Sequence, residues 1–361
     1  MSCLGISIYP EHSTVQKDKD YIALAAKYGC RRIFTCLLSV KKDRDVIIKE
    51  FREIIDYAHS FQMEVILDVA PSVFDRLHIS YDDLFFFYDL HADGIRLDEG
   101  FDAFKEAQMT FNSYGLKIEI NASLGNAYLD NIISHYPNKN LLCTCHNFYP
   151  QRYTGLSFAH FQKCAKAIRK LQLPIAAFIS SQAKDTYGPW PINEGLCTLE
   201  MHRDLPPDVA ARHLFASGLV DDVIIANCYA SEEEFLSLQK IRPEMLMFKL
   251  ELEGQLQITE KNILYHHRHF VRGDLSEYMA RSTQPRVTYA KESIPVRNTR
   301  SLKRGDVIII NDSYERYKGE LQIILKDMEN DGRKNVIGHI PIHEHILLDY
   351  LDSWKSFSFI Q

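Results

Sequence analysis

The feature that most constrains this chain is a regular alternation of short apolar runs with longer segments of helical period, continuing to about residue 241. The apolar runs contain few polar residues, which is typical of strands covered on both faces in a parallel sheet. Parallel neighbours need crossover helices, and the intervening segments supply them. Eight such units in about 240 residues favour a closed (β/α)8 barrel over an open doubly wound sheet. The expected strands are residues 3–9, 31–37, 64–70, 93–98, 116–122, 141–146, 175–180 and 221–227.

The segments between these runs carry helix signals. Asp43 and Ser157 stand before apolar-periodic stretches, and Gly29 and Gly115 stand near helix ends. An open sheet would be favoured by a glycine-rich phosphate turn after the first strand, and the stretch "ISIYPEHST" has none. The expected helices are residues 18–29, 43–61, 80–89, 101–114, 125–136, 157–171, 207–218 and 231–241.

The pattern changes after Arg242 and Pro243, where short strand-like runs are separated by turn residues with little helix between them. Residues 328–335 contain an Asp-Gly pair that is typical of a hairpin turn. We therefore predict a barrel domain over residues 1–243, followed by a small, mostly β domain over residues 244–361.

Composition narrows the choice of partners. The formal charge of −6 argues against nucleic acid or an anionic membrane surface as the main partner. The first residues show no signal-peptide pattern, and no apolar run approaches the roughly 18 residues that a membrane span needs. The eight cysteines are scattered without a CxxC pair, which fits reduced thiols in a cytoplasmic protein.

The stretch "CTCH" at residues 143–146 raises a zinc alternative. A strand would place Cys143 and Cys145 on one face and His146 on the other, and no second ligand pair follows at finger spacing. We expect no metal and no cofactor.

In a barrel of this class the active site forms at the carboxyl ends of the strands and on the loops that follow them. The expected strands end repeatedly in polar groups, and buried charge is costly unless it is paired or functional. A ligand pocket would explain why these polar groups cluster at the carboxyl ends of the strands. Asp98 and Glu119 are the first candidates for catalytic carboxyls, with Asp68 third, although each could instead pair with Arg96 or another cation. Glu11, Arg96 and Asn121 are candidates for binding the substrate.

Two loops supply further binding candidates. The segment 146–157 displays His146, Asn147, Tyr149, Arg152 and Tyr153, whose rings and donors suit a sugar, although they could simply cover the rim. The loop over residues 180–207 is long enough for a lid or binding loop, or it could be a rigid surface flap. Its candidates are Glu200, His202 and Arg203.

Basic residues concentrate in the second domain, within residues 266–286. In a chain of net negative charge, this local positive density suggests binding of an anionic group such as phosphate, with Arg272 and Arg281 as candidates. The alternative is that these arginines pair with carboxylates.

Several stretches together resemble the 6-phospho-N-acetylmuramidases, bacterial glycosidases formerly catalogued as a domain of unknown function. The resemblance covers essentially the whole chain, and it is most specific in "HNFYP" with "YTGLS". It implies a TIM barrel followed by a cyclophilin-like β domain. It also implies cytoplasmic hydrolysis of N-acetylmuramic acid 6-phosphate–N-acetylglucosamine in cell-wall sugar recycling. The stretches are "GISIYPEH", "DGIRLDEGF", "HNFYPQRYTGLS", "LCTLEMHR", "RSTQPR", "RGDVIIIN" and "YKGELQI".

Glycoside hydrolysis normally uses two carboxyl groups, about 5–5.5 Å apart in retaining enzymes and about 6.5–9.5 Å apart in inverting ones. The implied partner is a small phosphorylated disaccharide, and the sequence leaves open whether the chain forms a homo-oligomer. Two other classes remain open: a non-catalytic sugar-phosphate sensor, and another sugar-phosphate enzyme on the same barrel. An aldolase would need a Schiff-base lysine, and neither Lys117 nor Lys249 lies at the carboxyl end of an expected barrel strand.

Overall fold

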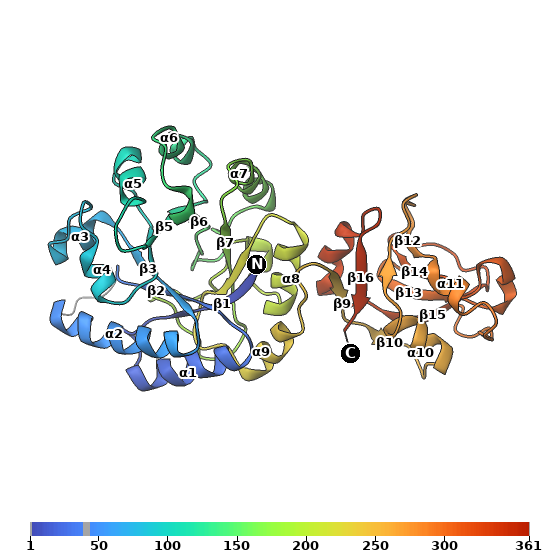
Figure 1. Ribbon diagram of the computed structural model, residues 1–361. Helices are drawn as coiled ribbons and strands as arrows, with labels where there is room; N and C mark the ends of the chain where they lie inside the picture. The colour runs from blue at the N-terminus through green and yellow to red at the C-terminus, as the bar shows by residue number, and fades with distance from the viewer. Residues whose placement is uncertain (1, 39–43, 361) are drawn as a thin grey trace. The chain divides into compact units, whose positions relative to one another are not determined.

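The computed structural model describes residues 2–38 and 44–360. The chain divides into two compact units (Figure 1). One contains the residues up to Leu214 together with Gly218–Gln239, and the other contains Phe215–Ser217 together with the residues from Lys240 onward. This division differs from the predicted boundary at residues 243 and 244 by a few residues and by the short Phe215–Ser217 segment.

The first unit is a closed barrel of eight parallel strands in sequence order, so the predicted (β/α)8 class is confirmed. Each observed strand overlaps the run predicted for it. The bounds are β1 Cys3–Ile8, β2 Arg32–Cys36, β3 Glu64–Val69, β4 Gly94–Leu97, β5 Lys117–Asn121, β6 Leu142–Cys145, β7 Ile175–Ile179 and β8 Asp222–Ile225.

The helices form the outer layer of the barrel, and several begin where a side chain caps the first turn. Thr14, Asp102 and Ser157 each accept a hydrogen bond from a backbone N–H three residues later. The predicted helix start at Asp43 lies outside the described residues. The helices are α1 Val15–Lys27, α2 Arg44–Ser60, α3 Pro71–Leu77, α4 Phe85–Asp89, α5 Ala103–Met109, α6 Tyr128–Ser134, α7 Phe158–Lys170, α8 Pro207–Ala216 and α9 Glu232–Gln239, with short 3-10 turns η1 Lys139–Leu141 and η2 Glu200–His202.

One crossover differs from the prediction. Between β3 and β4 the sequence predicts one helix over residues 80–89, whereas the structure has two short ones, α3 and α4. Pro71 occupies the first turn of α3, where its missing N–H costs nothing, and α3 ends at His78 in the left-handed conformation. The added helix carries the chain away from the carboxyl end of β3, where Asp68 lies.

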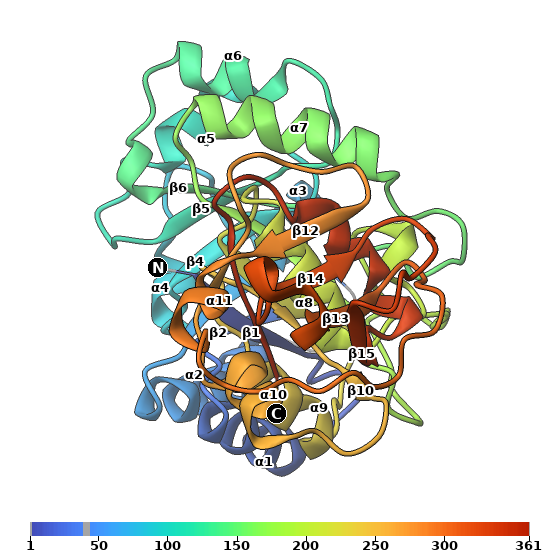
Figure 2. The same cartoon turned by 90° about the vertical axis from the view of Figure 1, so that its right-hand side faces the viewer.

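The second unit is mostly β, as predicted. A five-stranded sheet has the order β10-β15-β13-β14-β12, and a three-stranded sheet has the order β11-β16-β9. Strands β12, β13 and β14 lie side by side in both views (Figures 1 and 2). The cyclophilin-like character remains a prediction. The elements are β9 Leu246–Phe248, β10 Glu251–Leu252, α10 Ile258–Tyr265, β11 His269–Phe270, β12 Met279–Ser282, α11 Gln284–Thr288, β13 Asp306–Ile310, η3 Asp312–Tyr317, β14 Leu321–Ile324, β15 Lys334–His339, η4 Ile342–Tyr350 and β16 Ser356–Phe359.

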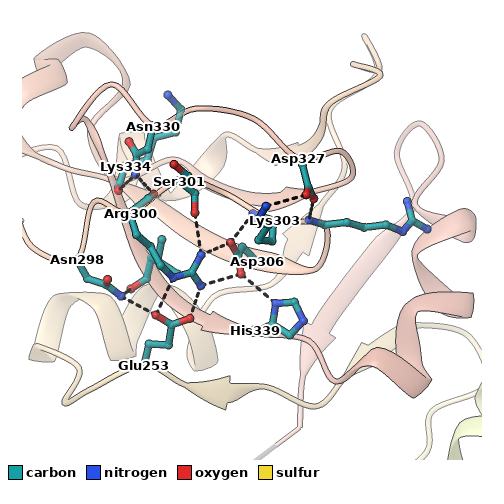
Figure 3. A network of polar contacts seen from close by, with 12 residues as sticks. Glu253, Asn298, Arg300, Ser301, Lys303, Asp306, Asp327, Asn330, Lys334 and His339 are labelled. Atoms are coloured by element: carbon teal, nitrogen blue, oxygen red, sulfur yellow. Dashed lines mark hydrogen bonds and ion pairs between the residues drawn. The ribbon is translucent and has the colours of Figure 1, made fainter.

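A buried ionic network fastens one side of this sheet (Figure 3). Asp306, at the start of β13, is fully buried and accepts hydrogen bonds from both terminal nitrogens of Arg300, at 2.7 and 3.0 Å. The same guanidinium donates to Glu253, and the His339 ring at the end of β15 lies 2.9 Å from Asp306. These hydrogen bonds outweigh desolvation and lower the pKa of Asp306. The network therefore ties the segment before β13 to β15 and to the chain after β10.

Candidate active site

Four predicted site residues meet at the carboxyl ends of β3, β4 and β6, around the buried guanidinium of Arg96. Its Nη1 donates to Oδ1 of Asp68 at 2.5 Å and to Oδ1 of Asp98 at 3.1 Å. Its Nη2 donates to the side-chain oxygen of Asn147. The parallel register accounts for this cluster, because it places Arg96 directly beside Asp68 on the neighbouring strand.

The two carboxyls of this cluster differ in environment. Asp68 is buried, and desolvation raises its pKa to about 7, against the lowering effect of Arg96 and with a further raising effect from Asp98. Asp98 is more open, with 37% of its side chain exposed. One group can therefore hold a proton near neutral pH while the other is accessible to a ligand.

The spacing of these carboxyls is short. Because both contact the same nitrogen, at 2.5 and 3.1 Å, their nearest oxygens lie less than about 6 Å apart, which is below the separation of about 6.5–9.5 Å found in inverting glycosidases. Cys36 was not anticipated from the sequence. Its thiol lies 3.8 Å from Oδ2 of Asp68, and the register of β2 against β3 pairs these two residues directly.

Glu119, predicted as the partner of Asp98, is placed differently. Its carboxylate is fully buried and accepts a hydrogen bond from Arg32, the first residue of β2. The other terminal nitrogen of Arg32 contacts Asp222, the first residue of β8, at 2.8 Å. Glu119 therefore belongs to an ionic group that reaches the amino ends of the strands, and the structure brings Asp98 together with Asp68 instead.

A second layer of polar groups holds Asn147 in place. Its backbone N–H donates to the hydroxyl of Ser123 at 2.8 Å, and that hydroxyl also lies 3.3 Å from Nδ1 of His146. His146 is fully buried, and burial lowers its pKa to about 3, so the ring is neutral. Asn121 accepts from the backbone N–H of Ser123 at 2.9 Å. Ser123 was missed in the sequence, although its place two residues beyond Asn121 puts it at the same strand end.

Glu200 and Arg203 fasten the long loop to the segment after β6. Glu200 accepts from both Arg203 and the backbone N–H groups of Tyr153 and Gly155, at 2.6 to 2.8 Å, which lowers its pKa to about 2. The buried Arg203 guanidinium also donates to the carbonyls of Tyr149, Glu194 and Gly195. These two predicted binding residues thus have their polar groups engaged within the protein.

The remaining candidates from the two loops differ in how far they are exposed to solvent. Arg152 forms a two-point contact with Asp204 at 2.7 and 2.9 Å, whereas Tyr153 is 84% exposed. Tyr149 is partly buried. His202 is fully buried, with its Nε2 2.9 Å from Nδ1 of His213. Tyr149 and Tyr153 therefore remain open to a binding role, and His202 packs inside the barrel layer.

The loop after β1 contributes Glu11, whose Oε2 is buried and has no hydrogen-bond partner among the described residues. The Tyr187 ring, from the long loop, lies 6.3 Å from the His12 ring, centroid to centroid, which brings the long loop against the segment after β1. Glu11 thus lies next to this contact in the chain and stays a candidate for binding the substrate.

In the second unit, the predicted phosphate-binding arginines have carboxylate neighbours. Arg281 contacts the fully buried Glu320 at 2.7 and 3.1 Å, and Arg286 approaches the same carboxylate at 3.6 Å. Arg272 pairs with Asp274. Because two arginines share one glutamate, the Arg281 and Arg286 pair retains one net positive charge.

Within residues 2–38 and 44–360, no group of three or more His, Cys, Asp and Glu side chains is arranged to hold a metal ion. No helix in the same ranges is both long enough and apolar enough to cross a membrane. No disulfide joins the eight cysteines, all of which belong to the described part of the chain.

The closed barrel thus carries two unlike carboxyls side by side at the carboxyl ends of its strands, where the active sites of barrel enzymes form. The sequence comparisons identify the particular family. Residues 4–240 match the N-terminal region of 6-phospho-N-acetylmuramidase, and residues 246–360 match its C-terminal region. The chain therefore belongs to the 6-phospho-N-acetylmuramidase family, as the sequence resemblance implies.

Solved structures with the same fold include an uncharacterized protein of B. cereus, 51% identical, with a TM-score of 0.93 over 100% of this chain and 99% of that chain. A conserved protein of Enterococcus faecalis with an unknown function is 25% identical, with a TM-score of 0.75 over 100% of this chain and 96% of that one. No match is found among proteins with curated descriptions.

Proposed function

We propose that this protein hydrolyses N-acetylmuramic acid 6-phosphate–N-acetylglucosamine, with Asp68 and Asp98 as the catalytic carboxyls. The observation that carries the proposal is the shared contact of these two groups with Nη1 of Arg96, one buried with a raised pKa and the other exposed. Family membership supports the reaction class, and the family name motivates the choice of substrate.

In the first step, the carboxylate of Asp98 attacks the anomeric carbon while protonated Asp68 gives its proton to the glycosidic oxygen. The bond to that oxygen breaks, and the second sugar leaves as an alcohol. In the second step, Asp68, now a carboxylate, takes a proton from water as the water oxygen displaces Asp98. The configuration at the anomeric carbon is retained, which fits the short spacing of the two groups.

Arg96 has a positioning role in this mechanism. Its guanidinium stabilises the Asp98 carboxylate before attack and the Asp68 carboxylate after proton transfer. Asn147 holds the other end of that guanidinium through Nη2. For Glu119 we propose a structural role in place of the predicted catalytic one, because its carboxylate is buried against Arg32.

The site of the 6-phosphate is a further part of the proposal. Within the second unit, the net positive charge that Arg281 and Arg286 keep beside Glu320 supports Arg281 and Arg272 as candidates for binding an anionic group. Glu11, Tyr149 and Tyr153 remain candidates for contacting the sugars. We place the reaction in cytoplasmic recycling of cell-wall sugars, in line with the composition of the chain and the family to which it belongs.

The test compares hydrolysis of the phosphorylated disaccharide with that of its unphosphorylated twin, measured as release of N-acetylglucosamine. We expect the phosphorylated substrate to be cleaved with a kcat/KM at least about 100-fold higher, as expected for two charge-assisted contacts to phosphate. Equal rates on both substrates would contradict a phosphate-binding site. Absence of sugar release from both substrates would contradict the proposed reaction.

A further inference from the structure

A pocket of about 310 Å³ opens directly beside Asp98, at the carboxyl ends of β4 and β5. Asp98 and Glu99 form its wall on the β4 side, and Asn121, Asn126 and Tyr128 form its wall on the β5 side. Its volume falls at the lower end of the range of about 300–1,000 Å³ for small-molecule sites. We call it the Asp98 pocket.

A second pocket, of about 300 Å³, adjoins the first between α6 and α7. The two share part of their walls, since Asn121, Leu124, Asn126 and Tyr128 line both. Helices α5, α6 and α7 lie next to one another in both views (Figures 1 and 2). Both pockets lie beside α6, whose first residue, Tyr128, lines both of them. A ligand seated beside Asp98 therefore has room to extend toward α7.

The charges in the Asp98 pocket select against anions. Among the described residues that line it are two carboxylates, Asp98 and Glu99, and no arginine, lysine or histidine. Arg96 pairs with Asp98 from behind this wall, but a phosphate or lactyl carboxylate placed in the pocket would meet two carboxylates and no lining cation, which costs free energy. A neutral ring with hydroxyl groups can donate to these carboxylates and bond to the amides of Asn121 and Asn126.

The shared wall offers an apolar contact next to these polar groups. Leu124 is 56% exposed and lines both pockets. Tyr128 packs so closely against the backbone of Gly100 that a Cβ there would lie 2.0 Å from the phenol oxygen, so a larger residue at position 100 would displace this ring. The combination of amide groups, acidic groups and an exposed aliphatic side chain matches an acetamido sugar, whose ring is polar and whose acetyl methyl is apolar.

The geometry points to the Asp98 pocket as the binding site for the neutral N-acetylglucosamine ring that leaves in the first step, with its acetyl methyl against Leu124. This assignment rests on the proposed function and adds the orientation of the substrate to it. The neutral sugar lies toward β5 and α6, and the phosphorylated sugar lies on the other side of the Asp68 and Asp98 pair.

The first experiment uses the full chain and two substrates: the phosphorylated disaccharide, and a 4-nitrophenyl glycoside of N-acetylmuramic acid 6-phosphate, which lacks the second sugar. Asn126→Asp keeps the oxygen that accepts the Tyr128 N–H at 3.1 Å, but it removes the amide donors and adds a charge. We expect the ratio of kcat/KM for the disaccharide to kcat/KM for the aryl glycoside to fall about tenfold. Asn131→Asp, on the exposed side of α6 and outside both pockets, should leave this ratio unchanged.

The second experiment measures binding without turnover. Saturation-transfer NMR should show that the protein binds N-acetylglucosamine more strongly than N-acetylglucosamine 6-phosphate, and Glu99→Lys should weaken this preference about tenfold. An unchanged substrate ratio in Asn126→Asp, or no preference for the neutral sugar, would overturn the assignment. If the unaltered protein hydrolyses neither substrate, the proposed function is overturned. The NMR result would still decide whether the pocket binds the neutral sugar.

Discussion

At the scale of single residues, the site depends on how one guanidinium is shared. Arg96 is buried and serves Asp68, Asp98 and Asn147 at once. A buried arginine stays charged, so its burial is costly unless acceptors surround it, and the two carboxyls provide them. The same contacts hold the two acidic groups next to each other at one strand end.

Replacing the carboxyls one at a time should distinguish the two proposed catalytic groups, Asp68 and Asp98, from Glu119, for which we propose a structural role. Asp68→Asn and Asp98→Asn should each lower kcat by about 10²–10⁴-fold, because each removes a proton donor or a nucleophile. Glu119→Gln should keep a kcat much closer to that of the unaltered chain but lose about 3 kcal/mol of stability, because it leaves Arg32 buried with less compensating charge. Steady-state kinetics and denaturant unfolding check the series. A Glu119→Gln protein that is stable and inactive would contradict the assignment.

The pH dependence should follow Asp68. Its pKa is raised to about 7, and the reaction needs its protonated form, so kcat/KM should fall as the pH rises through about 7. Initial rates on the phosphorylated disaccharide between pH 5 and 9 measure this fall in kcat/KM. A profile that stays flat up to pH 9 would exclude Asp68 as the proton donor.

At the scale of elements, the strands were predictable and their loop contacts were not. The apolar runs identify all eight barrel strands, because a strand buried on both faces leaves a pattern in its own sequence. The roles of Glu200 and Arg203 depend on partners about 45 to 55 residues away in the chain, which no local pattern reveals. Glu119 is fully buried, and this could not be predicted either. The alternation of residues along a strand predicts which face Glu119 lies on, but it does not predict how far from solvent it lies.

Arg203 should matter far more for the long loop than Arg152 does. Arg203→Met removes the donor to Glu200 and to three backbone carbonyls in a buried setting, so we expect a loss of roughly 2–4 kcal/mol in the free energy of unfolding. Arg152→Met breaks a solvent-exposed pair with Asp204 and should change the free energy of unfolding far less, because exposed ion pairs contribute little to stability. Denaturant unfolding of both variants gives the comparison, and equal losses would contradict the proposed fastening role of Arg203.

At the scale of the whole molecule, the change of pattern after residue 243 predicted a mostly β second region, and the structure has one. The short Phe215–Ser217 segment that joins the second unit was not visible, because it continues the helical period of α8. The second unit has a core of its own, built from strands of both its sheets, including Leu246, Val307, Ile323 and Phe357. Its stability can therefore be probed by itself within the full chain.

The second unit should lose stability in mild acid because of His269. This ring is fully buried against Phe357, and burial lowers its pKa from 6.5 to about 4. The unfolded chain then binds a proton that the folded unit does not, so about 2 kcal/mol of stability present at pH 7 should be lost at pH 5. Fluorescence of Trp354 in a Trp190→Phe background reports denaturation of this unit. His269→Phe should reduce that loss, and an unchanged pH dependence would assign it to other groups.

The shared nitrogen of Arg96 has a consequence for how kinetic measurements must be interpreted. Desolvation raises the pKa of Asp68, and the negative charge of Asp98 raises it further, so a change at Asp98 also changes the proton donor. Neutralising Asp98 by mutation would shift the titration of Asp68 downward as well as delete the attacking group. The Asp68→Asn and Asp98→Asn penalties will therefore be non-additive, and a double variant should lose less than the product of the two single effects.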